Sequence, residues 1–181
     1  NSLKEMGMMF GFEVVALNAE YIKDIRVSST KIRSAVLEGQ ISYAEELLTK
    51  PFPFSGVVVE GQKLGRTLGF PTANIRIDEE LKIIPKNGVY AVKVKLENTG
   101  WLQGMLNIGE RPTVSRTKTN SGSIEVNIFD FEEDIYSKKI QLLFIERIRD
   151  EKKFSGLDEL QSAISKDKKM ALEILSESKK K

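Results

Sequence analysis

Short runs rich in β-branched and aromatic residues, separated by turn signals, limit what most of this chain can fold into. The runs cover residues 57–60, 88–96, 101–108, 123–131 and 140–148. The run 88–96 alternates between apolar and charged residues, with one slip of phase. Turn-forming asparagine and glycine lie between the later runs. Five or six antiparallel strands at this spacing predict a small closed barrel, because closure removes exposed strand edges.

The first fifty residues have a mixed α/β pattern instead. Residues 12–17 form a short apolar run that predicts a strand. Ser28 and its hydroxyl-bearing neighbours can cap a helix that ends at Gly39. The spacing from Ser42 to Glu45 is that of a capping box and predicts a second short helix.

Two prolines, Pro51 and Pro53, separate these two patterns. They predict a domain boundary, with an α/β piece over residues 1–50 and a β domain over residues 54–181. The tail of the β domain predicts a helix that packs over the barrel, because its apolar residues recur at helical spacing. These residues are Leu157, Leu160, Ile164, Ala171, Ile174 and Leu175.

Composition excludes several kinds of site and partner. The 28 basic residues nearly balance the 26 acidic ones, so the net charge of +2 makes nucleic acid a weak candidate partner. Without cysteine there is no disulfide, thiolate metal site or cysteine nucleophile, which fits a cytoplasmic location. Without histidine, a general base must be a carboxylate or, less often, a lysine or tyrosine.

We also expect no membrane partner. The most apolar early stretch, residues 6–17, is interrupted by Glu13 and is too short to span a bilayer. It also lacks the basic start of a signal peptide.

The segment 61–75, GQKLGRTLGFPTANI, carries the residues best suited to a ligand. Its glycines allow sharp turns and a close backbone approach. Lys63 and Arg66 offer charge to phosphate, while Thr72 and Asn74 offer oxygen ligands that a Mg²⁺–nucleotide complex accepts. The segment lacks the spacing of a standard phosphate loop. From the residues alone, a nucleotide-binding loop and a mobile surface hairpin loop with solvated charges both stay open.

Glu125 is the candidate general base. Alternation along residues 123–128 puts Glu125 and Asn127 on one face and the isoleucines and valine on the other. One interpretation is a solvent-facing strand residue. The other is a carboxylate on the rim of the barrel, facing a cavity shared with the loop 61–74. Within reach of a substrate hydroxyl, such a carboxylate accepts its proton during attack on a γ-phosphate.

Several motifs together make this chain similar to the riboflavin kinases. GxxxGRxLGFPTANI resembles the nucleotide-binding loop of that family. Further matches follow in the expected order, so that the resemblance covers roughly residues 54–170: Gly88-Val89-Tyr90, Asn107-Ile108-Gly109, Arg111-Pro112-Thr113, Phe129-Asp130-Phe131, Asp134, Tyr136, the run 149–154, Leu160 and Asp167. The resemblance implies a mainly β fold, a six-stranded antiparallel Greek-key barrel with a C-terminal helix, preceded here by the short α/β piece.

The same resemblance implies an activity and a set of site residues. The family transfers the γ-phosphoryl group of ATP to the ribityl 5′-hydroxyl of riboflavin, giving FMN and ADP. Carried over by position, Thr72 and Asn74 would hold Mg²⁺ and the phosphates, and Glu125 would be the base. The rest of the nucleotide pocket would come from Gly61, Lys63, Gly65 and Arg66.

The flavin is expected to contact Arg149, Glu151 and Phe154, and two of these residues have a second interpretation. Arg149 either contacts the flavin or pairs with neighbouring carboxylates on the surface. Phe154 either packs near the isoalloxazine or forms a hydrophobic staple at the start of the last helix.

Residues 27–33, VSSTKIR, resemble the S-S-T-x-I-R motif near the end of the FMN adenylyltransferase domain in bacterial bifunctional riboflavin kinase/FMN adenylyltransferase enzymes. A helix N-terminus with these residue types suits nucleotide phosphates. The earlier part of that domain, with its histidine-containing motif, has no counterpart here. We therefore expect no adenylyltransferase activity from this chain, and expect the missing domain to accompany it in a longer protein.

Three functions compete at this point. The first is an ATP-dependent riboflavin kinase, and the second is a flavin- or nucleotide-binding module without turnover. The third is a small barrel for single-stranded nucleic acid, which needs a basic groove and stacking aromatic residues. The low net charge and an aromatic content of 8% argue against the third function, and the resemblance favours the first.

Overall fold

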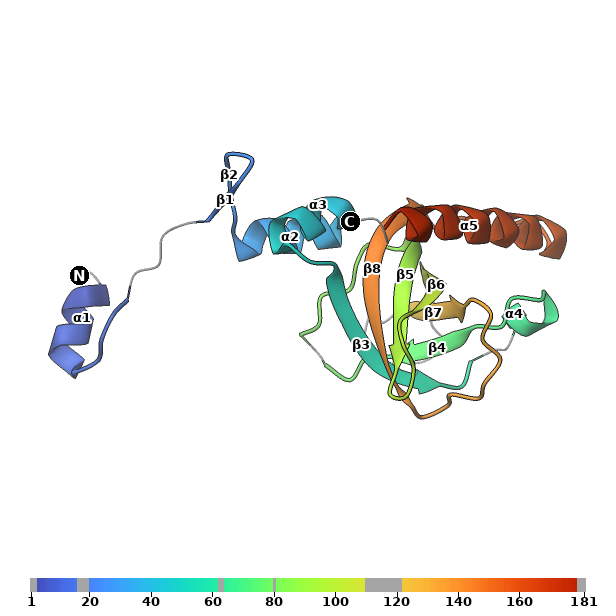
Figure 1. Ribbon diagram of the computed structural model, residues 1–181, viewed down its shortest axis with the longest axis horizontal. Helices are drawn as coiled ribbons and strands as arrows, with labels where there is room; N and C mark the ends of the chain where they lie inside the picture. Colours follow the sequence, from blue (N-terminus) through green and yellow to red (C-terminus); the bar gives the residue numbers. More distant parts are fainter. Residues whose placement is uncertain (1–2, 16–19, 62–63, 80, 110–121, 179–181) are drawn as a thin grey trace.

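A closed six-stranded antiparallel barrel forms the centre of the computed structural model (Figure 1). The structure describes residues 3–15, 20–61, 64–79, 81–109 and 122–178. The barrel strands are β3 (Phe52–Val59), β4 (Ala73–Arg76), β5 (Gly88–Leu96), β6 (Leu102–Gly109), β7 (Ser123–Ile128) and β8 (Lys139–Arg149). Their order is β3-β4-β7-β6-β5-β8, and β8 pairs with β3 to close the barrel. The predicted mainly β Greek-key barrel is thus confirmed.

Three strands differ from the predicted runs. β7 ends at Ile128, although its run was predicted to reach residue 131. β3 begins at Phe52, so Pro51 lies just before the strand and Pro53 lies just inside it. Proline is tolerated there because β4 pairs with β3 only from Val57 onward, which leaves no ladder on that side of Pro53. β4 was absent from the predicted strands, since its four residues lie within the segment interpreted as a ligand loop. The division of the chain near residue 50 stays a prediction.

Alternate residues of each strand fill the barrel interior. In β5, the interior residues are Tyr90, Val92, Val94 and Leu96. Val89 and Ala91 are buried as well, but on the outer face of the strand. Ala91 belongs to a second apolar cluster with residues of the last helix. The strand itself alternates regularly. The slip of phase in the sequence arises because the outer face of β5 is buried as well as the inner face.

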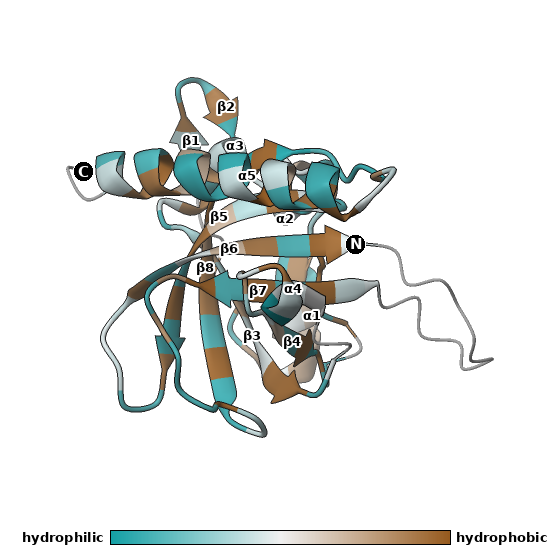
Figure 2. Cartoon of the chain, turned by 90° about the vertical axis from the view of Figure 1, so that its right-hand side faces the viewer, coloured by the Kyte–Doolittle hydropathy of each residue, from teal (hydrophilic) through white to brown (hydrophobic). Residues whose placement is uncertain are grey.

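The helix that covers this outer face is α5 (Leu157–Glu177), as predicted (Figures 1 and 2). Ala171 and Leu175 are fully buried against the barrel, and Ile164 and Ile174 are partly buried. Leu157, in contrast, is 57% exposed and lies outside the buried face. The apolar stripe of the helix thus begins one turn later than the sequence pattern indicated.

The chain before the barrel contains α1 (Leu3–Phe10), the short strands β1 (Tyr21–Ile22) and β2 (Ile25–Arg26), and the helices α2 (Ser29–Leu37) and α3 (Ile41–Leu48). The strand predicted over residues 12–17 is wrong for residues 12–15, which form no strand, and residues 16–17 lie outside the described residues. Among the described residues of the apolar stretch, only the earlier residues 6–10 are in a regular element, the end of α1, which lies apart from the barrel in Figure 1.

The two predicted helices of this region are present. The Ser28 side chain accepts a hydrogen bond of 3.3 Å from the backbone nitrogen of Lys31, which confirms the predicted cap of α2. The predicted capping box of α3 is wrong, because the helix begins at Ile41 with Gln40 in the cap position. Ile41 is apolar and 1% exposed, so burial in the barrel core determines where this helix begins.

The helices α2 and α3 are attached to the barrel through this burial. Ile41 belongs to the core cluster of the barrel. Ala35, Val36 and Ala44 form a smaller cluster, against which Phe52 of β3 packs. The helix pair therefore shares one continuous apolar region with the β domain.

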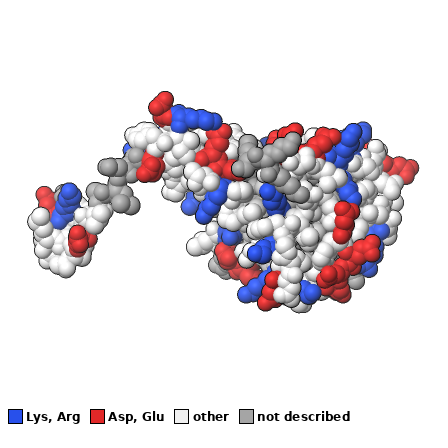
Figure 3. All heavy atoms as spheres, viewed as in Figure 1, with Lys and Arg blue, Asp and Glu red and all other residues white. Residues whose placement is uncertain are grey.

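The described helices and the surface charges give no sign of a membrane span or of a strongly charged face. No helix among the described residues is long and apolar enough to cross a membrane. On the face displayed in Figure 3, acidic and basic side chains are interspersed over the barrel. This mixture matches the net charge of +2 and gives that face no extended field of one sign.

Phe144 is at the centre of an aromatic group in the core. Its ring centroid lies 6.1 Å from that of Phe52, 5.7 Å from that of Phe54 and 5.1 Å from that of Tyr90. We expect Phe144→Ala to lower the free energy of unfolding by about 3–5 kcal/mol, because it leaves a cavity among these rings. Urea unfolding followed by circular dichroism measures the loss.

The control for this experiment is Leu81→Ala, since Leu81 is 95% exposed. Its unfolding free energy should change by less than about 0.5 kcal/mol. If the two variants were equally stable, Phe144 would not have the central packing role described here.

Candidate active site

The glycine-rich segment folds into the one-turn helix α4 (Leu64–Thr67) followed by a tight return. Gly65 permits this return, because a Cβ atom there would lie 2.3 Å from the carbonyl oxygen of Phe70 and 3.2 Å from Oγ1 of Thr72. The backbone nitrogen of Phe70 donates to the carbonyl of Gly65 at 2.8 Å. The close approach of two backbone segments thus requires glycine at this position.

Gly61 permits a second close approach, to Asn74. A Cβ atom at Gly61 would lie 2.0 Å from Nδ2 of Asn74. Asn74 itself is 6% exposed and lies in β4. The predicted nucleotide-binding residues Gly61 and Asn74 are therefore in contact with each other, while Lys63 lies outside the described residues.

Glu125 and Thr72 meet on the outer face of the barrel. Ile124 and Val126 of β7 belong to the interior core, so the side chain of Glu125 points outward. Oγ1 of Thr72 donates a hydrogen bond of 3.2 Å to Oε2 of Glu125. Asn74 is the strand partner of Glu125 between β4 and β7. Three predicted site residues thus come together at one place on the barrel.

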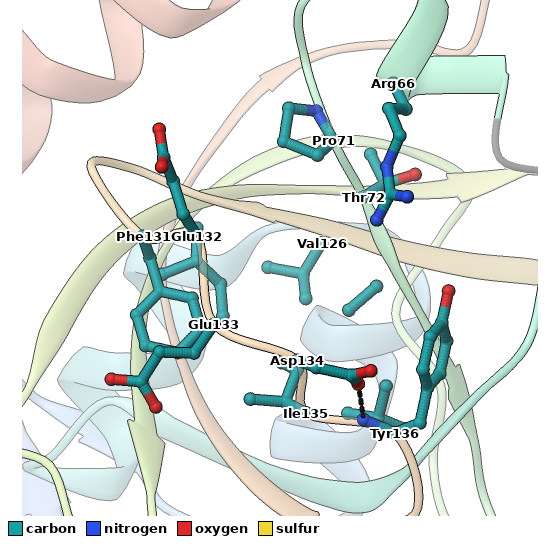
Figure 4. A pocket seen from close by; sticks show the side chains of 13 residues that line it. Arg66, Pro71, Thr72, Val126, Phe131, Glu132, Glu133, Asp134, Ile135 and Tyr136 are labelled. Atoms are coloured by element: carbon teal, nitrogen blue, oxygen red, sulfur yellow. Dashed lines mark hydrogen bonds between the residues drawn. The ribbon is translucent and has the colours of Figure 1, made fainter.

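A cavity of about 390 Å³ opens on one side of Thr72, and we call it the Arg66 cavity (Figure 4). Arg66 and Thr72 lie on one side of it, and Phe131 and Glu132 lie on the opposite side. Among the residues that the structure describes, Arg66 is the only cationic one that lines this cavity. The Arg66 cavity therefore has a positive side next to Thr72 and an acidic side away from it.

A second cavity, of about 300 Å³, lies on the other side of Thr72, between the barrel and α5. We call it the Phe154 cavity. Much of its wall is apolar and comes from Leu68, Phe70, Val89, Met105, Leu160 and Ile164. Glu125 and all three predicted flavin-binding residues also line it: Arg149, Glu151 and Phe154. An apolar cavity with a few polar groups is typical of a site for a small organic ligand.

Arg149 is paired with Asp167, a residue that belongs to the family resemblance but for which the sequence predicted no role. Its Nε donates to Oδ1 of Asp167 at 2.8 Å, and its Nη2 donates to Oδ2 at 2.7 Å. Asp167 lies on α5 and is 4% exposed. The guanidinium also lies 5.6 Å from the ring centroid of Phe154. Arg149 thus lines the cavity and is ion-paired, but with a buried partner rather than with surface neighbours.

Lys152 and Glu159 fix the start of α5 beside the Phe154 cavity. Glu159 accepts hydrogen bonds from the backbone nitrogen of Ser155 at 3.0 Å, the ammonium of Lys152 at 2.9 Å and the hydroxyl of Ser155 at 2.8 Å. These bonds, with the backbone bond first, lower the pKa of Glu159 to about 2. The ring centroid of Phe154 lies 5.5 Å from Nζ of Lys152, and this ring forms part of the cavity wall.

Sequence reasoning missed one buried amide in this region. Asn127 is 5% exposed, and its Nδ2 donates a hydrogen bond of 2.6 Å to the carbonyl of Pro71, next to Thr72. The alternation of β7 did place Asn127 on the same face as Glu125. An amide two residues from a candidate base was the available signal, but its partner lies 56 residues away along the chain.

A Greek-key barrel with a glycine-rich Pro-Thr-Ala-Asn segment and an outward carboxylate defines the class of this protein. The family model for riboflavin kinase, or flavokinase, matches residues 48–175. The chain therefore belongs to the riboflavin kinase family, which confirms the resemblance found in the sequence.

Similar proteins include the bifunctional riboflavin kinase/FMN adenylyltransferases of two bacteria. The Bacillus subtilis (strain 168) protein is 40% identical over 158 residues, which cover 87% of this chain and 49% of that protein. The Escherichia coli (strain K12) protein is 39% identical over 171 residues, which cover 94% of this chain and 53% of that protein. The chain thus spans about half the length of the curated relatives it matches.

A solved structure of a macrolide-efflux protein from Streptococcus pneumoniae is also similar to this chain. It superposes with a TM-score of 0.79 at 33% sequence identity. The match covers 94% of this chain and 55% of that chain, so it includes the helices before the barrel as well as the barrel itself.

The ion pair between Arg149 and Asp167 makes a prediction about α5. Asp167→Ala leaves the Arg149 guanidinium without its buried partner and should destabilise the protein by about 3–5 kcal/mol. The double variant with Arg149→Met removes both charges and should recover part of that loss. Urea unfolding of the single and double variants measures this coupling. If the two losses simply added, the pair would contribute nothing beyond its separate side chains.

Proposed function

We propose that this chain is a riboflavin kinase, which transfers the γ-phosphoryl group of ATP to the 5′-hydroxyl of riboflavin in the synthesis of FMN and FAD. The observation that carries the proposal is the hydrogen bond between Thr72 and Glu125 at the point where two cavities adjoin. Two substrates that exchange a phosphoryl group need two adjacent sites with a base between them. Membership of the riboflavin kinase family supports the choice of substrates.

Each cavity suits one of the two substrates. The Phe154 cavity suits the flat, apolar isoalloxazine, because aromatic and aliphatic side chains line it. The Arg66 cavity suits ATP, with the phosphates beside Arg66 and Thr72. Glu132 and Glu133 lie away from this positive side. The third carboxylate of the lining, Asp134, accepts a hydrogen bond of 3.0 Å from the backbone nitrogen of Tyr136.

Mg²⁺ fits the residues beside Glu125. Thr72 and Asn74 offer a hydroxyl and an amide oxygen, the hard oxygen ligands that this ion accepts. The described residues contain no cluster of three or more acidic side chains suited to a metal. A metal held by two neutral side chains would depend on the nucleotide phosphates for its remaining ligands. When bound, the ion neutralises charge on the phosphates.

In the proposed step, the riboflavin 5′-oxygen forms a bond to the γ-phosphorus of ATP while the bond from that phosphorus to the β–γ bridging oxygen breaks. The hydroxyl proton passes to Glu125, and ADP leaves. Thr72 holds the carboxylate in place through its hydrogen bond. Arg66 binds the phosphates, and the residues of the Phe154 cavity hold the flavin and exclude water. With no cysteine to protect or oxidise, the chain also fits the cytoplasm.

The test is a chromatographic assay for FMN after incubation with riboflavin, ATP and Mg²⁺. We expect FMN and ADP in equal amounts, and expect Glu125→Gln to lower kcat by about 10²-fold or more, because it keeps the shape but removes the base. Glu97→Gln is the matched control and should leave kcat unchanged, because Glu97 is exposed, follows β5 and lines neither cavity.

The other outcomes separate the competing functions. Binding of riboflavin or ATP without FMN would favour the binding module, and no binding of either would exclude the kinase. Undiminished turnover by Glu125→Gln would remove Glu125 from the role of base. Formation of FAD from FMN and ATP would refute the expectation that this chain lacks adenylyltransferase activity.

Asn127 makes a further prediction for the same assay. Asn127→Ala frees the carbonyl of Pro71, so Thr72 loses its fixed position beside Glu125. We expect kcat to fall by about tenfold, since small misplacements of reacting groups are costly. In a Thr72→Val background the same change should have little effect, because its target is already absent. Equal effects in both backgrounds would show that Asn127 acts elsewhere.

A further inference from the structure

A group of polar contacts outside both cavities lies where α2 and α3 meet the barrel. Its centre is Arg147 of β8. Nη2 of Arg147 donates to the carbonyl of Asn87 at 2.6 Å and to Oδ1 of Asp150 at 2.8 Å. Nε donates to the hydroxyl of Tyr90 at 3.3 Å. Arg147 therefore joins the segment before β5 to the segment after β8.

Irregular pairing between β5 and β8 explains why Arg147 points this way. The register shifts between Val89 and Tyr90, so Arg147 pairs with Tyr90 and Arg149 pairs with Val89. Tyr90 points into the barrel, whereas Val89 lines the Phe154 cavity. The bulge thus turns two arginines, which a regular strand would place on one face, to different sides.

The turn between α2 and α3 contacts the same group. A Cβ atom at Gly39 would lie 2.7 Å from Cδ of Arg147 and 3.3 Å from Cβ of Lys86. The backbone nitrogen of Lys86 donates to the carbonyl of Val36 at 3.4 Å. Gly39 has a φ of +76°, so glycine meets both the turn and the close approach. The helix pair therefore rests directly on Arg147 and on the segment before β5.

Asn87 connects this group to the Phe154 cavity. Its carbonyl is held by Arg147, and its Nδ2 donates a hydrogen bond of 3.1 Å to Oε2 of Glu151. Glu151 lines the Phe154 cavity. Continuous contacts thus run from Gly39 through Arg147 and Asn87 to the wall of that cavity.

We propose that Arg147 is a positioning residue for riboflavin, and that the helices α2 and α3 form part of the kinase site through it. The proposal rests on riboflavin binding in the Phe154 cavity, as in the proposed function. All of α2 and nearly all of α3 lie before residue 48, where the match to the riboflavin kinase family begins. The helix pair therefore has a role in the kinase reaction besides any role in the adenylyltransferase half of longer relatives.

The test compares Arg147→Met and Asn87→Ala in the full chain. The dissociation constant of riboflavin, followed by flavin fluorescence, should rise by about tenfold in each, because the hydrogen bond from Asn87 to Glu151 is weakened or lost. The KM for ATP should change by less than about twofold, since neither residue lines the Arg66 cavity. Arg147→Met should add little in the Asn87→Ala background, because its effect passes through Asn87.

Arg76→Met is the matched control. Arg76 is another strand arginine paired with a carboxylate, Asp78, at 2.7 Å, but on the exposed surface. It should leave riboflavin binding unchanged.

Three results would overturn the proposal: unchanged riboflavin binding in Asn87→Ala, equal weakening of both substrates, or additive effects in the double variant. If Arg147→Met does not fold, Asn87→Ala decides alone, because it keeps the backbone contacts. A wild-type chain that neither binds riboflavin nor forms FMN would instead refute the proposed function. The two failures are therefore distinguishable.

Discussion

The pairing of β8 with both β3 and β5 is the constraint on which the rest of the structure depends. These two ladders close the barrel and remove the edges that an open sheet would expose. β8 also supplies Phe144 to the aromatic core. Beyond the bulge it supplies Arg147 to the junction with α2 and α3, and Arg149 to the wall of the Phe154 cavity. A single strand thus contributes to the core, to the junction and to the candidate site.

Side chains fill the interior of this barrel, and the two cavities lie at its margins: the Phe154 cavity is on the outer face beside α5, whereas core residues such as Val58 and Val126 line the Arg66 cavity. The outward residues of β7, with the Pro71–Thr72 segment and α5, form walls that the barrel alone would lack. Polar residues can then face the cavities without entering the core, as Glu125 does. In β7, the inner face packs in the core and the outer face carries the polar residues of the candidate site. The residues needed for folding and those needed for chemistry are thus on different faces of one strand.

The sequence predicted those features that depend on local patterns. The bounds of β5 match the run 88–96, and α5 begins at Leu157, the first residue of the predicted helix. β4 escaped detection because four residues give too little alternation to distinguish a strand from a loop. The α3 cap was wrong because burial of Ile41 outweighed the capping preference of Ser42. In each case a contact distant in the sequence decided the outcome.

The same limit applied to the site. Thr72, Glu125 and Arg149 could be selected from their residue types and from the family resemblance, and the structure brings all three to the walls of the two cavities. The partners that hold them could not be selected in this way. Asp167 belonged to the family resemblance, but its pairing with Arg149 could not be inferred from its place on a helix. Asn127 resembled any strand amide until folding brought it to Pro71. The roles of such positioning residues can be identified only from the three-dimensional structure.

Thr72 lines both cavities, so ligands in them would be separated by a wall one residue thick. Thermodynamic reciprocity then applies to the two ligands. Any adjustment of this hydroxyl by the occupant of one cavity alters the affinity of the other, and the second ligand returns the same coupling free energy to the first. The order in which two substrates arrive would therefore affect the rates of assembly, but not the stability of the ternary complex.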